Sequence, residues 1–375
     1  MDNKKIDLPQ FTILVILITI GDSILVLPAI PAAIAKQDAW LSAILGLLIG
    51  LFVVYLLGTV GKLYPHLTLV EYNGKILGKW PGIVVSILFI FYPVLSVAAH
   101  VREIGDFTTT HIMTNTPVLM VNLLFVVIIV MGARLGIEVI ARSGEIFFFF
   151  FTILFVVFVI ALIPLIDFKN VQPILEGGIK PVINGAFTVV AFPFMELVVF
   201  LMVLPYVNHQ KKIRKSFLIG SLCGGLVLVI IISFTILILG SDLTQRSFYP
   251  TFALAKVIRI GDFLERIEVI LAVMWILTTY YKITFYFYIL NVALAQIVRI
   301  KEYKVLLYPM GMIITVLSIV ISPNAAYFND TISKYWPFYD STFGVFLPLL
   351  LLTVAFIRKK HGKIGYNQEK SNTDH

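Results

Sequence analysis

Long apolar stretches, separated by short polar or charged segments, run along nearly the whole chain. A transmembrane helix needs about 20 mostly apolar residues, and this length recurs through the sequence. The pattern predicts an all-α polytopic membrane protein with ten transmembrane helices. The predicted spans lie near residues 9–35, 40–62, 82–111, 116–133, 145–166, 180–206, 216–240, 266–298, 304–322 and 341–357.

Composition agrees with a membrane protein, since the 375 residues are 59% hydrophobic and only 13% charged. Soluble domains are roughly 45–50% apolar and about 25% charged. The low charge excludes a soluble enzyme and a disordered chain. The first span is preceded by Lys4 and Lys5 like a signal peptide, but it is about twice as long as the usual 7–15-residue apolar region. It also contains Asp22 and two prolines, so we expect it to be retained as a helix.

The distribution of basic residues predicts the orientation of the spans. With the N-terminus in the cytoplasm, 19 of the 29 Lys and Arg residues fall on that side and 9 on the other, while Lys282 lies within a span. An excess of Lys and Arg marks the cytoplasmic side. We therefore expect both termini in the cytoplasm, and we attribute the net charge of +8 to topology rather than to nucleic acid binding.

Three segments between or after the spans have patterns of their own. Residues 241–265 mix apolar and basic positions, which predicts a short amphipathic helix at the outer surface. Residues 327–339 are rich in Tyr, Phe and Trp and predict an interfacial aromatic belt in an outer loop. Residues 358–375 predict a flexible basic cytoplasmic tail after a single ten-helix domain of residues 1–357.

Four spans carry ionisable residues at membrane depth. Asp22, Glu196 and Lys282 are central in the first, sixth and eighth spans, and Glu103 lies in the outer half of the third. Such a group costs several kcal/mol unless it faces a partner or water, so it is a candidate functional residue. Lys282 is expected to pair with Asp22, Glu196 or a carbonyl. Glu103 is either a ligand contact or part of a simple charge cluster with Arg102.

The first and sixth spans also contain residues that break helices. Gly21 removes side-chain restraint and Pro193 removes a backbone donor, although either can merely kink a helix. Two broken helices five spans apart are typical of transporters built from two inverted five-helix repeats, placed here at about 9–166 and 180–357. A site at such breaks suits an amino-acid zwitterion. The candidate ligand-binding residues are Gly21, Asp22, Ser23, Glu103, Phe192, Pro193, Phe194, Glu196 and Lys282.

Motifs of catalysis do not occur in the sequence. It contains no GxSxG, HExxH, Walker A or strand-associated GxGxxG pattern, and its six histidines show no metal-ligand spacing. We predict that the protein is not an enzyme and that it uses neither a cofactor nor a metal.

A succession of short segments resembles the endospore germination permeases, which are the B subunits of nutrient germinant receptors (GerAB type) in the amino acid–polyamine–organocation superfamily. Single motifs are weak, but their order and spacing fit along essentially the whole chain. The segments are Ile20–Leu25 with Pro28, Asp38–Trp40, Leu67–Tyr72, Gly136–Arg142, Pro193–Glu196 and Phe263–Glu268.

The resemblance implies a LeuT-like fold and a role in the inner membrane of the dormant spore. A small nutrient, typically an amino acid, would bind the B subunit, which works with an A subunit and a lipoprotein C subunit. The nutrient-binding site that the resemblance implies would involve Gly21, Pro193–Glu196, Glu103 and the region of Lys282. Asp22 departs from the family pattern of a small or uncharged residue, so it implies an amine-directed ligand, a coupling cation or an ion pair with Lys282.

Three functions remain open at this point. The first is a receptor subunit in which nutrient binding shifts a conformational equilibrium. The second is a proton- or cation-coupled amino acid transporter that uses the same pocket. The third is a membrane scaffold that binds no ligand, which would leave the midplane acids unexplained.

Overall fold

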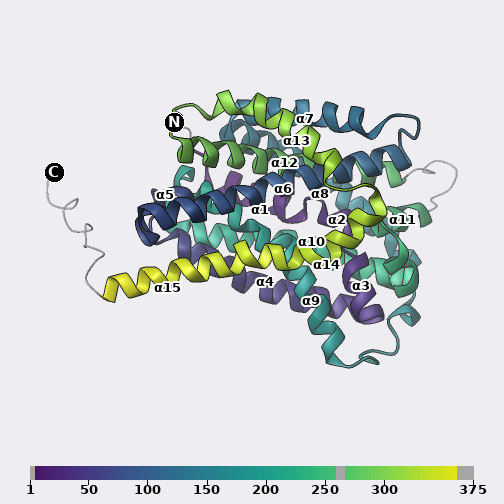
Figure 1. Cartoon of the computed structure of the whole chain (residues 1–375). Helices are drawn as coiled ribbons and strands as arrows, with labels where there is room; N and C mark the ends of the chain where they lie inside the picture. Colours follow the sequence, from purple (N-terminus) through teal and green to yellow (C-terminus); the bar gives the residue numbers. More distant parts are fainter. Residues whose placement is uncertain (1–4, 259–266, 361–375) are drawn as a thin grey trace.

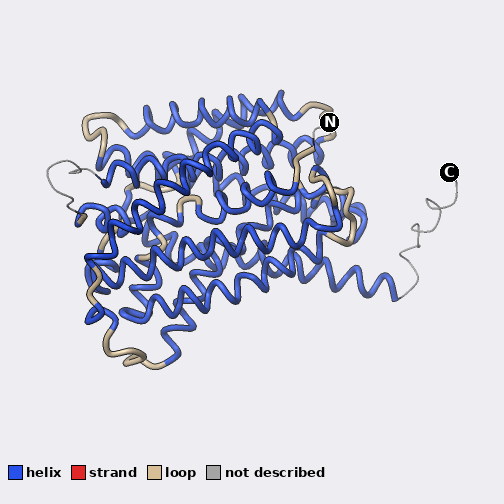
Figure 2. The backbone as a smooth tube through the Cα atoms, turned by 180° about the vertical axis from the view of Figure 1, so that it is seen from behind, coloured by secondary structure: helices blue, strands red, loops and turns tan. Residues whose placement is uncertain are grey.

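The structure is a computed structural model that describes residues 5–258 and 267–360, and this part of the chain is a bundle of helices (Figure 1). Ten helical segments in it are long and apolar enough to cross a membrane, as predicted. They run roughly along a common direction and are joined by short loops at the two ends of the bundle (Figure 2).

The α-helices are α1 (Leu8–Ile20), α2 (Ser23–Val26), α3 (Ala29–Ala35), α4 (Ala39–Gly61), α5 (Leu69–Leu77), α6 (Lys79–His111), α7 (Val118–Leu135), α8 (Ile137–Leu162), α9 (Ile179–Phe194), α10 (Ile213–Arg246), α11 (Pro250–Val257), α12 (Ile267–Val298), α13 (Leu307–Val320), α14 (Ala325–Ser341) and α15 (Leu347–Lys360). Two irregular helical segments matter for the site. These are the 3₁₀-helix η4 (Met195–Met202) and the π-helix η8 (Thr342–Phe346).

The first span is broken at Gly21, as predicted. The backbone there has φ 37° and ψ −128°, so α1 ends and the chain turns before α2 begins at Ser23. A side chain rarely adopts a positive φ. A Cβ atom at this position would also lie 2.5 Å from Cδ of Lys282 and 3.1 Å from the carbonyl oxygen of Ile18. Glycine is therefore required by both the turn and the close passage of Lys282.

The sixth span changes its helix type instead of unwinding. Pro193 lies in the last turn of α9, and the chain continues from Met195 as the 3₁₀-helix η4. A 3₁₀-helix has 3.0 residues per turn instead of 3.6, and such a stretch within a helix often marks a functional site. Glu196 follows directly after this change.

Small residues allow the helices to approach closely. Gly220 and Gly224 of α10 lie against Val15 and Thr19 of α1, where a Cβ atom at either glycine would come within 2.7 Å of the opposing side chain. Small residues at helix interfaces are the usual means of close packing in membranes. α10 therefore packs directly against the broken first span.

Two span boundaries differ from those predicted. The fifth span begins at Ile137 instead of 145, because the polar first turns of α8 stay helical and Arg142 pairs with Glu138 one turn away. The prediction of an outer loop at 327–339 was wrong. These residues form α14, which continues through η8 into α15, so the last span starts near Ala325 and contains the buried Asp340.

The short helix predicted within 241–265 is present as α11, and its Phe252 and Leu254 are buried in the protein. Residues 259–265 of that segment, and most of the motif 263–268, lie outside the described residues. The predicted tail lies outside them from residue 361, whereas residues 358–360 still belong to α15.

The start of α1 and the end of α15 lie at the same end of the bundle, here called the N-terminal end (Figure 1). Arg358 near the end of α15 donates hydrogen bonds to the carbonyl oxygens of Lys75 and Leu77 at α5. This placement agrees with an even number of spans. The membrane side that this end faces stays a prediction, and so do the boundaries of the two repeats.

We expect Gly21→Ala to destabilise the protein. The positive φ alone costs about 1–3 kcal/mol for a residue with a side chain, and the contact with Lys282 adds to it. Gly74→Ala is the matched control, because nothing lies within 4 Å of a Cβ atom there. Thermal unfolding of both variants in detergent tests this expectation. Equal midpoints for the two variants would contradict it.

Candidate functional site

The ammonium group of Lys282 is shared by two carboxylates in the middle of the bundle. Lys282 lies on α12 and is 1% exposed. Its Nζ lies 2.5 Å from Oδ1 of Asp22, at the break of the first span, and forms a second ion pair with Oε2 of Glu196 on η4. A buried ion pair is tolerated only when its charges are paired and hydrogen-bonded. The three charged residues predicted at midplane therefore meet in one cluster.

His100 of α6 joins the same cluster. Its Nδ1 lies 2.5 Å from the carbonyl oxygen of Ser96, which can only accept, so Nδ1 carries a proton. Its Nε2 lies 3.2 Å from Oδ1 of Asp22. Two lone pairs facing each other at this distance would repel, so a proton lies between Nε2 and Oδ1. With one proton shared between His100 and Asp22, the four residues Asp22, Glu196, Lys282 and His100, here called the midplane cluster, carry no net charge.

The backbone freed at Gly21 is already satisfied within the protein. The hydroxyl of Thr278 donates to the carbonyl oxygen of Gly21 at 2.8 Å. Buried backbone carbonyls need such partners in a membrane. This carbonyl is therefore used to hold α12 against the break.

The midplane cluster also has the geometry of a cation site. Asp22, His100 and Glu196 offer ligand atoms that lie within 4.8 Å of one another. Oxygen and imidazole nitrogen atoms at this spacing suit a divalent cation. The Lys282 ammonium, however, contacts two of the three side chains and supplies the positive charge. A metal ion would have to displace it, so the residues present do not fit a resident metal.

A cavity of about 500 Å³ leads to the midplane cluster from the end of the bundle opposite the N-terminal end. This volume is typical of small-molecule sites. Asp22, His100, Glu103, Phe192 and Glu196 line its inner part. Its walls come from α3, the last turn of α10 and α14, with Phe248, Phe328 and Trp336 among the aromatic residues.

Among the described residues, Glu103 is the acid in this cavity that has no cation within ion-pairing distance. Its side chain is buried, and its Oε1 has no hydrogen-bond partner. The neighbouring Arg102 forms a separate pair with Asp106 at 2.9 Å and donates to the carbonyl oxygen of Ser322 at 2.9 Å. The alternative of an Arg102–Glu103 charge cluster therefore does not fit the structure.

The remaining predicted site residues lie away from the cavity wall, apart from Phe192. Phe194 packs between α4 and α10, where Cβ atoms at Gly50 and Gly225 would overlap its ring. Pro193 is buried in the last turn of α9, and Ser23 is buried with a hydroxyl that has no partner. Within the described part of the chain, the residues that line this cavity include neither these three nor Gly21.

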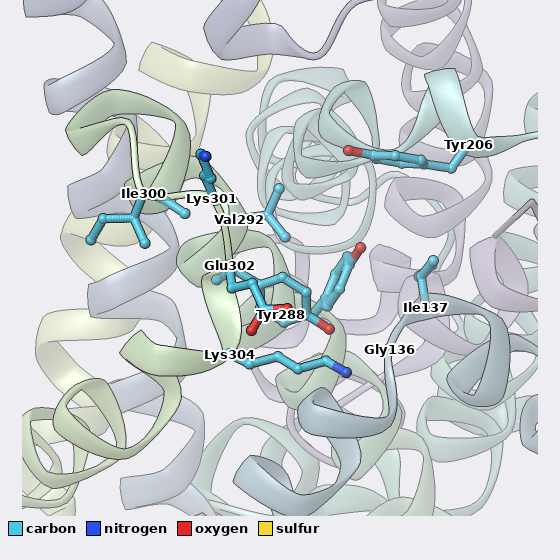
Figure 3. A pocket seen from close by; sticks show the side chains of 11 residues that line it. Gly136, Ile137, Tyr206, Tyr288, Val292, Ile300, Lys301, Glu302 and Lys304 are labelled. Carbon is cyan, nitrogen blue, oxygen red and sulfur yellow. The ribbon is translucent and has the colours of Figure 1, made fainter. Parts of the chain in front are cut away.

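Four phenylalanine side chains pack together on the N-terminal side of the midplane cluster. The ring centroids of Phe200 and Phe285 are 4.6 Å apart, and Phe11 lies 5.5 Å from Phe200 and 5.8 Å from Phe217. All four side chains are fully buried. Beyond them lies a separate cavity of about 170 Å³, where Tyr206, Tyr288 and Lys304 are seen in Figure 3. In the described part of the chain, the cavity that reaches the midplane cluster is the one lined by α3 and α14.

Sequence reasoning missed several buried polar residues around the midplane cluster. Tyr286 donates to the carbonyl oxygen of Glu196 at 3.0 Å, and Tyr92 donates to Oδ1 of Asp340 at 3.0 Å. His100 was recognisable, because it lies three residues before Glu103 and therefore on the same helix face. Asp340 had no such signal, since its segment was assigned to a loop.

The comparisons with known proteins agree with this architecture. The family model described as "Spore germination protein" matches residues 5–326. Spore germination protein KB of Bacillus subtilis (strain 168) is 31% identical over 373 residues, covering 98% of this chain and 99% of its own. These two matches bear out the family resemblance found in the sequence.

Two solved transporter structures are similar in fold. Mhp1, a nucleobase-cation-symport-1 family transporter in a closed conformation with bromovinylhydantoin bound, has a TM-score of 0.71 and 12% identity, covering 96% of this chain and 81% of its own. MhsT in complex with L-phenylalanine has a TM-score of 0.65 and 14% identity, covering 92% and 97%. These likenesses show the predicted LeuT fold, a fold of transporters. From the family match and the full-length relative, this chain belongs to the spore germination permease family.

Proposed function

We propose that the protein is the B subunit of a nutrient germinant receptor and that its cavity binds a small nutrient, such as an amino acid. The resemblance and the family membership support the germination role. The single observation that carries the binding proposal is Glu103, a buried carboxyl group with an unpartnered oxygen in a cavity of small-molecule size.

The charges around the cavity favour a ligand with an ammonium group. Asp22 and Glu196 are balanced by Lys282 and by the proton between His100 and Asp22, so the midplane cluster carries no net charge. Glu103 remains as an additional acid beside it. A buried charge is strongly unfavourable without a partner. An ammonium group of the ligand supplies that partner.

The position of the cavity at two irregular helix segments gives ligand binding a way to act on the fold. A ligand that enters from the open end meets the break at Asp22 and the 3₁₀ segment at Glu196 together. It shifts the conformational equilibrium by its differential affinity for the open and closed arrangements. In this proposal the A subunit and the C-subunit lipoprotein read that shift in the spore inner membrane, with both termini of this chain in the cytoplasm.

A proton- or cation-coupled amino acid transporter is the second candidate. Its support is the fold shared with the two transporters and a central site that is open to one end of the bundle. A scaffold without a ligand is a weaker candidate, because it gives no role to Glu103 or the cavity.

Retention of labelled amino acids by the purified chain in proteoliposomes separates binding from transport. We expect a plateau at or below about one ligand per protein, because the cavity has room for one small ligand. Continued accumulation under a proton or sodium gradient would instead identify a transporter. No retention of any amino acid, together with no thermal stabilisation by one, would support the scaffold.

We expect Glu103→Gln to weaken the binding of an amine-bearing nutrient about tenfold or more, because a hydrogen bond to a charged group contributes roughly 1.5–3 kcal/mol. Isothermal titration or ligand-dependent thermal stabilisation measures the change. Glu138→Gln is the control, since Glu138 lies far from the cavity and pairs with an exposed Arg142. Unchanged affinity in Glu103→Gln would contradict the assignment of Glu103.

A further inference from the structure

A second buried carboxyl group lies outside the nutrient cavity. Asp340 of α14 is 0% exposed, and its Oδ2 has no hydrogen-bond partner. Its Oδ1 accepts one hydrogen bond, from Tyr92. Among the described residues, no Lys, Arg or His nitrogen lies within ion-pairing distance of it.

The described surroundings of Asp340 offer no free cation to neutralise it. The titratable groups around it are Glu196 on η4, Tyr92 on α6, Tyr286 and Lys282 on α12, Tyr339 on its own helix and, further away, Asp22. Lys282 is already engaged by Asp22 and Glu196. An ionised Asp340 would therefore be an uncompensated charge in the interior, which costs far more than a neutral carboxylic acid.

Two tyrosines connect this acid to the midplane cluster. Tyr286 donates to Glu196, Tyr92 donates to Asp340, and the ring centroids of the two tyrosines are 6.4 Å apart. The backbones of the two acid-bearing segments also touch. A Cβ atom at Gly344 of η8 would lie 2.5 Å from the carbonyl oxygen of Met195, the residue before Glu196. The π-helix that begins two residues after Asp340 thus packs on the segment that carries Glu196.

We propose that Asp340 is a proton-binding site of this bundle, distinct from the nutrient cavity and linked to Glu196 through Tyr92 and Tyr286. The proton resides on Oδ2, the oxygen that has no partner, while Oδ1 accepts from Tyr92. Movement of the last span away from Met195 and Glu196 admits water to Oδ2 and releases the proton to it. The site is independent of the proposed function, because it exists without any nutrient.

Infrared difference spectroscopy of the full-length chain in lipid tests the proposal directly. At neutral pH we expect a protonated-carboxyl C=O band that is lost in Asp340→Asn and kept in Asp242→Asn, an exposed aspartate on α10. Tyr92→Phe should shift the band without removing it, because the hydrogen bond to Oδ1 is lost. Tyr92→Phe keeps the proposal testable if Asp340→Asn does not fold.

Thermal stability gives an independent measurement that needs no nutrient. If Asp340 holds a proton only in the folded state, the folded protein binds more protons than the unfolded one. Stability then falls as pH rises above about 4, the ordinary pKa of an aspartate in the unfolded chain. Asp340→Asn should reduce this fall. A C=O band that is unchanged in both Asp340→Asn and Tyr92→Phe would overturn the proposal. So would sodium- or potassium-dependent stabilisation at neutral pH that is lost in Asp340→Asn, since that result would assign the site to a metal cation.

Discussion

The contact of one lysine with two carboxylates is the interaction on which the rest of the structure depends. Lys282 joins the break of the first span to the 3₁₀ segment of the sixth span, so three spans meet at a single nitrogen atom. Removing one partner of a buried pair leaves an uncompensated charge and typically costs 3–5 kcal/mol. This dependence explains why Gly21 has no side chain, since the lysine stem passes directly over it.

The arrangement of charge divides the buried acids into three roles. Asp22 and Glu196 are neutralised within the protein, Glu103 faces a cavity, and Asp340 is sealed from it. These carboxyl groups therefore differ in chemistry, because each has different charged and polar groups within a few ångströms. For a germination permease, this separation keeps the proposed nutrient contact apart from the proposed proton site.

Much of the fold and part of the site were predictable from the sequence. The spans followed from apolar length, and Asp22, Glu196 and Lys282 were visible because ionisable residues at membrane depth are rare. The sequence did not predict that the polar first turns of α8 and α14 are helical. Polar residues are accepted there because helix packing buries them or pairs them with other polar groups. The directions of the side chains after Phe194 were not predictable, since the change from 3.6 to 3.0 residues per turn at Met195 rotates every later side chain.

The position of Phe194 has a mechanical consequence for the bundle. Its ring lies close against α4 at Gly50 and against α10 at Gly225, at the end of α9 where the 3₁₀ segment begins. The Phe194 ring lies so close to Gly50 and to Gly225 that neither position has room for a Cβ atom. The ring therefore cannot move away from one glycine without pressing on the other. α4, α9 and α10 are therefore packed at their closest approach around this ring, and a side chain at either glycine would force them apart.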